Sequence, residues 1–278
     1  MDHLKARVAL VVLDGFLAVT AMWGALLVVP QLPLSVLRFG PFTDFAIPAI
    51  ALGSVGVVAA VGALAAPVRP ALAAIASILA GGAIVVFEIV EAAAVGSLLN
   101  APSGLDVHGY VALWLQPVYA IMGLTIVAVA FFGLYRPWHW RWGAVSEELN
   151  RVMPGDEIVA NPTFDATRAV TVQAAPSQIW PWIAQIGFGR AQHPSVGYEV
   201  LDERTGIRAH RHQRTLEDIG QGRTRMLTRV RIKYPWTSPW VLFDLLLIEP
   251  WDFPMMRKCM LGIKRRAESL AGRRVIAA

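Results

Sequence analysis

Four long apolar runs dominate the first half of the chain. They cover about residues 8–29, 45–66, 71–98 and 111–134. Each run is long enough to cross the roughly 30 Å hydrocarbon core of a bilayer at about 1.5 Å per helical residue. Proline, glycine and asparagine residues separate the runs, as is typical of turns. The pattern predicts four transmembrane helices within residues 1–135.

The pattern changes in the second half to shorter segments that are typical of an α+β domain. Residues 166–174 alternate apolar with polar side chains and predict a strand. Apolar positions then recur at helical spacing from Pro176 to Ile186, which predicts a helix with proline at its start. Residues 222–234 alternate again, with Met226 on an apolar face and arginines on the other face.

A long basic helix is predicted from about Trp240 to Leu270, and it completes a domain over residues 159–270. An interfacial linker at 136–158 precedes this domain, and a basic tail at 271–278 follows it. The helix also carries acidic residues, which we expect on its polar, solvent-facing side. These residues are Asp244, Glu249 and Asp252.

Composition agrees with a membrane protein. Hydrophobic residues make up 55% of the 278 residues and charged residues only 16%, against about 25% charged residues in an average globular protein. The first 134 residues carry four lysines and arginines against six acidic residues, and the remainder carries 21 against 14. The single cysteine, Cys259, excludes an internal disulfide, so nothing in the sequence requires an oxidising compartment.

Basic residues next to the apolar runs predict the orientation. Those on one side of the membrane are Lys5, Arg7, Arg69, Arg136 and Arg141. The other side has Arg38 alone. Because lysine and arginine are enriched in cytoplasmic segments, we expect a multi-pass protein of the inner membrane with both termini in the cytoplasm.

Polar residues within the apolar runs are the first candidate functional groups, because a carboxyl group in hydrocarbon is costly. They are Asp14, Glu88, Glu91 and Gln116. Glu88 and Glu91 are three residues apart and share a helix face, and Gln116 is expected at a similar depth as a hydrogen-bond donor. Three roles stay open: packing contacts, a path for protons or cations, and contact with a lipid head group or small ligand.

Other motifs that carry chemistry are weak. His193, His210 and His212 lie near arginines that would repel a cation, and the glycine pairs lack the spacing of a phosphate-binding loop. No Ser-His-Asp or Cys-His arrangement can be assembled. We therefore expect no metal, no cofactor and no nucleic acid partner.

Segments of the first half resemble a group of bacterial four-helix membrane proteins. They are LPLSVLRFGPFTDFAIPAIALG at residues 32–53, VFEIVEAAAVGSLLN at 86–100 and WLQPVYAIMG at 114–123. The resemblance covers most of residues 1–135. It implies the four-helix fold and no particular activity.

The second half resembles the START-like superfamily, also called SRPBCC or polyketide cyclase-like domains, over residues 142–270. The matching segments are the lead-in WGAVSEELNRVMPGDEIV, the first strand and helix TRAVTVQAAPSQIWPWIAQIGFGRA, the last strand GRTRMLTRVRIKY and the last helix EPWDFPMMRKCMLGIKRRAE. The resemblance implies a helix-grip fold whose curved sheet forms one wall of a ligand cavity. The stretch between Arg190 and Gln221 is too short for the usual strands, and GYEVLDERTG within it resembles the second helix of the family. We therefore expect a membrane all-α four-helix bundle followed by a truncated helix-grip α+β domain with an incomplete sheet.

This resemblance selects the candidate site residues of the second half. The apolar pocket wall would consist of Trp180, Trp182, Tyr198, Met226, Phe243, Phe253 and Met256. The basic residues expected at an anionic membrane surface are Arg257, Lys258, Lys264, Arg265 and Arg266.

The expected function is non-enzymatic binding or handling of a lipid or another apolar small molecule at the inner membrane face. Membrane lipid is the expected partner, and an apolar ligand and a second copy of the chain are further candidates. Two alternatives stay open. One is a structural or assembly membrane protein whose START-like part has lost its cavity, and the other is a cyclase- or hydrolase-type enzyme.

Overall fold

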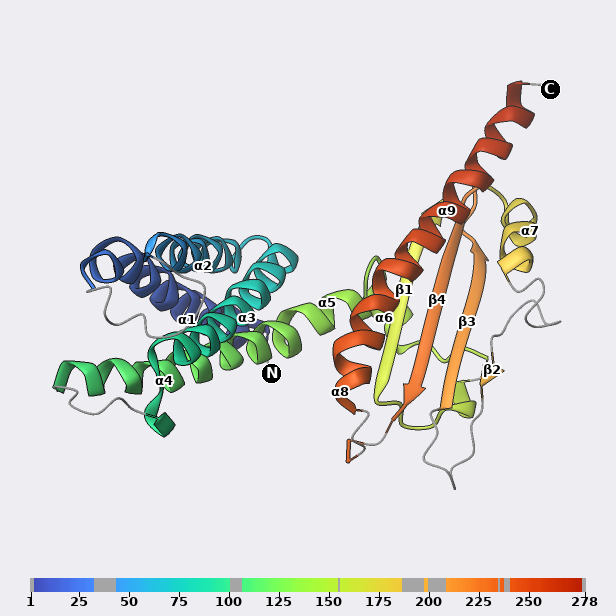
Figure 1. Cartoon of the computed structure of the whole chain (residues 1–278). Coiled ribbons are helices and arrows are strands. Elements are labelled where there is room, and N and C mark those ends of the chain that lie inside the picture. Colours follow the sequence, from blue (N-terminus) through green and yellow to red (C-terminus); the bar gives the residue numbers. More distant parts are fainter. Residues whose placement is uncertain are drawn as a thin grey trace. The chain divides into compact units, whose positions relative to one another are not determined.

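The chain forms two compact units, Met1–Trp138 and His139–Ala278 (Figure 1). The computed structural model describes residues 3–32, 44–100, 107–154, 156–186, 198–199, 209–234, 236–237 and 241–276. The division between the units falls three residues after the domain boundary that the sequence predicts at residue 135.

The first unit is built from four long helices. They are α1 (His3–Trp23), α2 (Ala46–Ala65), α3 (Pro70–Val95) and α4 (Val107–Ala130). Short π and 3-10 segments extend α1 through η1 (Gly24–Val28) and η2 (Val29–Gln31), and α4 through η5 (Phe131–Tyr135) into α5 (Arg136–Trp140). Within the described ranges, four helices are long and apolar enough to cross a membrane, as predicted. Large apolar side chains cover their outer surface, as expected where lipid replaces water.

Small residues and buried polar contacts hold these helices together. Helices α3 and α4 touch at Gly81 and Gly123, where a Cβ atom on either glycine would lie 2.6 Å from the other's carbonyl oxygen. Such close backbone approach is the usual way in which apolar helices associate in lipid. The Ser77 hydroxyl of α3 donates a 2.6 Å hydrogen bond to Oδ2 of Asp14 in α1, and both side chains are fully buried.

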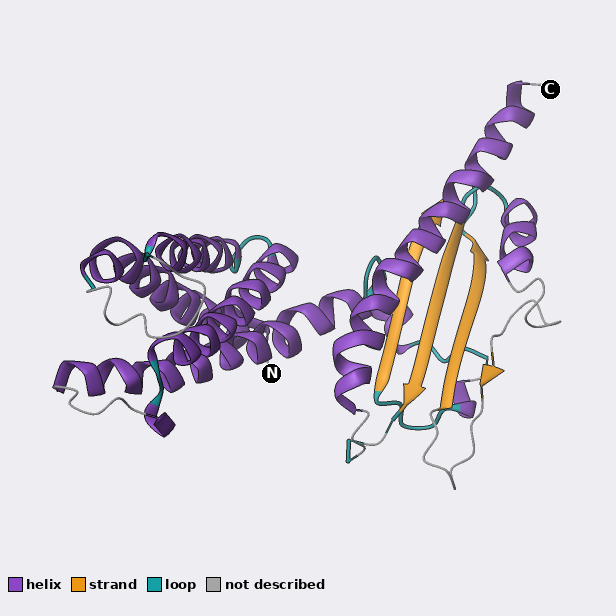
Figure 2. Cartoon of the chain, viewed as in Figure 1, coloured by secondary structure: helices purple, strands orange, loops and turns teal. Residues whose placement is uncertain are grey.

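The second unit is an antiparallel sheet combined with helices (Figure 2). Its strands are β1 (Phe164–Val172), β2 (Tyr198–Glu199), β3 (Ala209–Asp218) and β4 (Thr224–Lys233), in the order β1-β4-β3-β2. Its helical segments are α6 (Ser146–Asn150), η6 (Asp156–Ile158), α7 (Pro176–Ile186), α8 (Val241–Phe243), η7 (Asp244–Ile248) and α9 (Glu249–Ile276).

The two faces of the sheet have different covers. On one face, Val172 of β1 and Met226 of β4 pack against Met260 and Ile263 of the long helix α9, which runs along β1 in Figure 1. On the other face, Arg225 and Arg229 of β4 bind α6. Period-two alternation of β4 therefore predicts its two faces correctly.

Two expectations for this unit need correction. Tyr198 and Glu199 pair with β3 as a strand, whereas the sequence resemblance suggests a helix there; the rest of GYEVLDERTG lies outside the described residues. The acidic residues Asp244, Glu249 and Asp252 are buried, whereas the sequence predicts them on a solvent-facing side. The π turn of η7 causes part of this difference, because its i→i+5 hydrogen bonds bring Asp244 and Glu249 to one side of the helix.

The contact between α3 and α4 makes a first prediction. Gly81→Ala places a methyl group against the Gly123 carbonyl and should lower the free energy of unfolding by about 1–3 kcal/mol. Gly82→Ala is the matched control, since no atom lies within 4 Å of a Cβ at that position. Denaturant unfolding of both variants in detergent measures the difference, and equal stability would contradict the close contact.

Candidate functional site

The four-helix unit contains an apolar cavity at one end of the bundle. Its volume is about 910 Å³, and its wall includes Leu52, Phe87, Leu113 and Tyr119. These residues belong to α2, α3 and α4, and the end of α1 completes the wall. Ligand sites in proteins are commonly apolar cavities of about 300–1,000 Å³ with a few fixed polar groups, so the cavity has the size of a ligand site.

The cavity wall includes the intramembrane polar residues that the sequence singles out on α3 and α4. Glu88, Glu91 and Gln116 all line it. The side-chain amide of Gln116 donates to Oε1 of Glu91 at 3.4 Å and to the Gly96 carbonyl oxygen at 3.1 Å, so Gln116 fixes the Glu91 carboxyl group. Glu88 is buried, and its carboxyl group forms no hydrogen bond with another described residue. Its oxygens are therefore available to a molecule in the cavity.

Asp14 has a different environment from the two glutamates. It lies in the bundle core, outside the cavity wall, and its Oδ2 accepts the hydrogen bond from Ser77. A Cβ on Gly62 of α2 would lie 2.9 Å from both Oδ2 of Asp14 and the Ser77 hydroxyl. Three helices thus meet around Asp14, which gives it the position of a packing contact.

In the second unit the structure distributes the predicted pocket residues over several places. Trp182 and Met226 belong to the core between α7, the sheet and α9, where Met226 is fully buried. Phe253 and Met256 are buried on α9. The remaining three are Trp180 and Phe243, which are exposed, and Tyr198, which lies in β2.

A buried ion pair occupies the sheet face beneath α9. Arg168 of β1 has no exposed surface, and its Nη1 donates to Oδ2 of Asp252 at 2.6 Å. Its Nε donates to the His139 carbonyl oxygen at 2.8 Å, and its guanidinium lies over the Phe253 ring at 5.4 Å. Arg168 therefore links the sheet, α9 and the chain that enters the domain.

A second buried acid on α9 also has a partner on the sheet side. Glu249 is fully buried and accepts a short hydrogen bond from the Tyr234 hydroxyl group, directly after β4. Because Asp252 and Glu249 are both engaged, these carboxyl groups hold α9 on the sheet.

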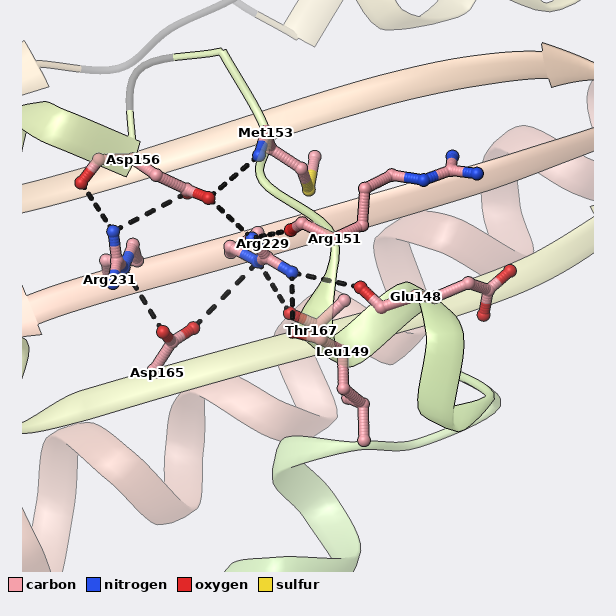
Figure 3. A network of polar contacts seen from close by, with 9 residues as sticks. All are labelled: Glu148, Leu149, Arg151, Met153, Asp156, Asp165, Thr167, Arg229 and Arg231. Carbon is pink, nitrogen blue, oxygen red and sulfur yellow. Dashed lines mark hydrogen bonds and ion pairs between the residues drawn. The ribbon is translucent and has the colours of Figure 1, made fainter.

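The opposite face of the sheet carries an arginine network (Figure 3). Arg229 lies at its centre, and its N–H groups meet acceptors at 2.6–3.0 Å. The acceptors are Thr167 Oγ1, Asp156 Oδ2 and the carbonyl oxygens of Glu148, Leu149 and Arg151. A guanidinium has five N–H donors, so each donor has an acceptor. Two of these carbonyl groups, those of Glu148 and Leu149, lie in the last turn of α6. Carbonyl groups in the last turn of a helix have no backbone donor within that helix, and Arg229 supplies one.

Two further arginines complete this network. Arg225 binds both carboxyl oxygens of Glu148, at 2.7 and 2.8 Å. Arg231 donates to Asp165 at 3.2 Å and to the Asp156 backbone carbonyl.

The carboxylates of the network respond differently to their surroundings. The hydrogen bonds from Arg225 hold the pKa of Glu148 below its ordinary value; the Val145 backbone N–H adds to this effect, and burial opposes it. Burial raises the pKa of Asp165, although the charges of Arg231 and Arg229 act in the opposite direction. Glu148 is thus the acid whose charge the network stabilises.

Four of the five predicted membrane-surface residues are exposed, and Lys264 is partly buried. Arg257 lies over the Trp142 ring at 5.4 Å and Arg266 over Trp182 at 5.6 Å. Lys264 donates to the Thr171 carbonyl oxygen at 2.7 Å. Lys258 and Arg265 are exposed, like Arg257 and Arg266.

Sequence reasoning missed the charged residues with the most contacts. Arg168 had a signal, because it stands at an inward position of β1, between Ala166 and Val170 in the alternation. A charged residue at such a position requires a buried partner. Arg229 had no comparable signal, since an arginine on the polar face of a strand is ordinary when that face is exposed to water.

Comparison with known proteins finds no protein-family model, no curated protein and no solved structure that matches this chain.

The network around Arg229 makes a second prediction. Arg229→Lys keeps the charge but cannot reach all five acceptors, so it should lower the free energy of unfolding by about 3 kcal/mol. The control is Arg265→Lys on the exposed side of α9, which should change stability by less than about 0.5 kcal/mol. Denaturant unfolding of the full chain in detergent measures both, and an Arg229→Lys variant as stable as wild type would refute the assignment.

Glu148 makes a third prediction, on pH dependence. Because its pKa is lower in the folded than in the unfolded chain, its contribution to stability is present above its ordinary pKa of 4.5 and disappears as the pH falls through the lowered value. Glu148→Gln should therefore lower the unfolding temperature at pH 7, and the difference in unfolding temperature between this variant and wild type should decrease in acid. Thermal unfolding at a series of pH values measures this difference, with exposed Glu147→Gln as the control at pH 7. A difference in unfolding temperature that stays constant as the pH falls would contradict the prediction.

Proposed function

We propose that this chain is an integral membrane protein that binds a lipid or another amphiphilic small molecule in the cavity of its four-helix unit. The observation that carries the proposal is the apolar cavity of about 910 Å³ with Glu88, Glu91 and Gln116 in its wall. A mostly apolar wall favours a ligand with a hydrocarbon body, because such a ligand loses no polar contacts when it leaves water.

The polar residues favour a particular head group. Gln116 already holds Glu91, while Glu88 is buried without a donor from the described residues. A ligand group that donates hydrogen bonds, such as an amine or a hydroxyl, would satisfy the Glu88 carboxyl group. A carboxylate or phosphate head would meet two acidic side chains instead. The proposed ligand is therefore an amphiphile with a donor head group.

The second unit is proposed to be a START-like domain in a closed form. Its strand order, with the first strand beside the last and a long C-terminal helix against both, is compatible with the predicted truncated helix-grip fold. Met226, Met260 and Arg168 fill the sheet face beneath α9, which supports the alternative in which this domain has a structural role. The buried acids there have partners, so an enzymatic role has less support.

The proposed location is the inner membrane, with both termini in the cytoplasm. The basic residues that flank the apolar helices support this orientation.

The test is mass spectrometry of small molecules that remain bound to the protein after gentle purification. Ala94→Phe fills the cavity at a buried wall position, and Glu88→Leu removes its free carboxyl group. Both variants should lose most of a molecule that wild type retains. Asp14→Asn is the matched control, because it changes a buried carboxyl group of the same bundle outside the cavity, and it should retain the molecule.

The same samples separate a ligand from bulk lipid. A specific ligand is enriched over its abundance in the source membrane, and added stearylamine should compete with it more strongly than stearic acid does. If wild type and all three variants carry the same lipids in the proportions of the membrane, the cavity holds no specific ligand and the proposal fails.

A further inference from the structure

The C-terminal helix has an exposed apolar face that the pocket prediction does not explain. Phe243, Leu247, Trp251 and Met255 lie four residues apart along α8, η7 and α9, and their exposed fractions are 42%, 44%, 68% and 62%. Exposed apolar side chains are normal singly, but a continuous line of four large ones marks a contact surface.

Basic residues continue the same line. At about 100° per helical residue, Lys258 and Arg265 fall on the side of α9 that carries Trp251 and Met255, opposite the buried side that carries Met260. Both basic residues are exposed. We call these six residues, Phe243, Leu247, Trp251, Met255, Lys258 and Arg265, the outer face.

The acids of this helix point the other way. Asp244, Glu249 and Asp252 are buried, and Glu268 pairs with Lys264 at 3.5 Å. The segment therefore keeps its acidic groups inward and presents apolar and basic groups outward. This separation gives the outer face a positive charge next to its aromatic and aliphatic side chains.

From this surface we infer that the outer face docks on an anionic bilayer. Helices that lie in a membrane interface combine tryptophan, phenylalanine and leucine with lysine and arginine, because apolar groups enter the acyl boundary while cations meet lipid phosphates. The chain passes from its fourth apolar helix into this domain within a few residues, so a bilayer surface is always close by. The inference is independent of any ligand in the four-helix cavity.

The test uses the full chain in lipid nanodiscs with one copy per disc. Since Cys259 is the only cysteine, Cys259→Ala provides a background in which Met255→Cys carries a single environment-sensitive fluorophore. In discs rich in phosphatidylglycerol, this label should show blue-shifted emission and several-fold weaker quenching by acrylamide. The control label is at Val152→Cys, an apolar position of the same domain that is 84% exposed, and it should stay fully accessible to acrylamide.

Two further comparisons test the electrostatic part. The shift at position 255 should decrease in discs of phosphatidylcholine alone, and Lys258→Glu combined with Arg265→Glu should abolish it in the anionic discs. The charge variant changes only exposed side chains, so folding should persist, and thermal unfolding checks this.

Three results would overturn the inference. The first is a label at 255 that acrylamide reaches as freely as the control in anionic discs. The second is a shift that is insensitive to lipid charge and to the double charge variant. The third is a shift that appears only in discs with two copies, which would assign the outer face to contact with a second chain.

Discussion

The buried guanidinium of Arg229 is the constraint on which the second unit depends. Arginine cannot lose its proton inside a protein, so every one of its N–H groups needs an acceptor when it is buried. Here the acceptors come from β1 and from the chain between Glu148 and Asp156. Helix α6 has only five residues and cannot be stable by itself. Its position is therefore set by β4, through the carbonyl groups that Arg229 binds.

Arg168 has the corresponding role on the other face, and it changes what that face can do. The START-like resemblance predicts a ligand cavity between the sheet and the last helix. In this chain the same space holds the Arg168–Asp252 pair and closely packed methionine and isoleucine side chains. A buried ion pair adds little net stability, but it penalises any arrangement that separates its partners. The pair thus favours one position of α9 on β1, and a ligand would have to displace it.

The predictable parts of the structure are those in which one periodicity acts over many residues. Four apolar runs were enough to predict the four long helices, and period-two alternation located β1 and both faces of β4. The prediction for the acids of the last helix was wrong because it assumed that polar side chains of a helix face water. That assumption fails where Arg168 and Tyr234 provide buried partners and where the π turn of η7 changes the helical phase. The cavity of the four-helix unit was beyond sequence reasoning, since its volume depends on the space between helices. Its polar residues were still found, because a carboxyl group in an apolar run is conspicuous by itself.

The segment from His139 to Asp156 connects these observations. Its first residue is held by Arg168 through the His139 carbonyl oxygen, and its later residues are held by Arg229 on the opposite face of the sheet. Strands β1 and β4 thus fasten this segment from both sides, directly after the last apolar helix. Because removing one partner of a buried charged pair costs about 3–5 kcal/mol, these contacts fix the segment on the sheet of the second unit more strongly than the five residues of α6 could by themselves.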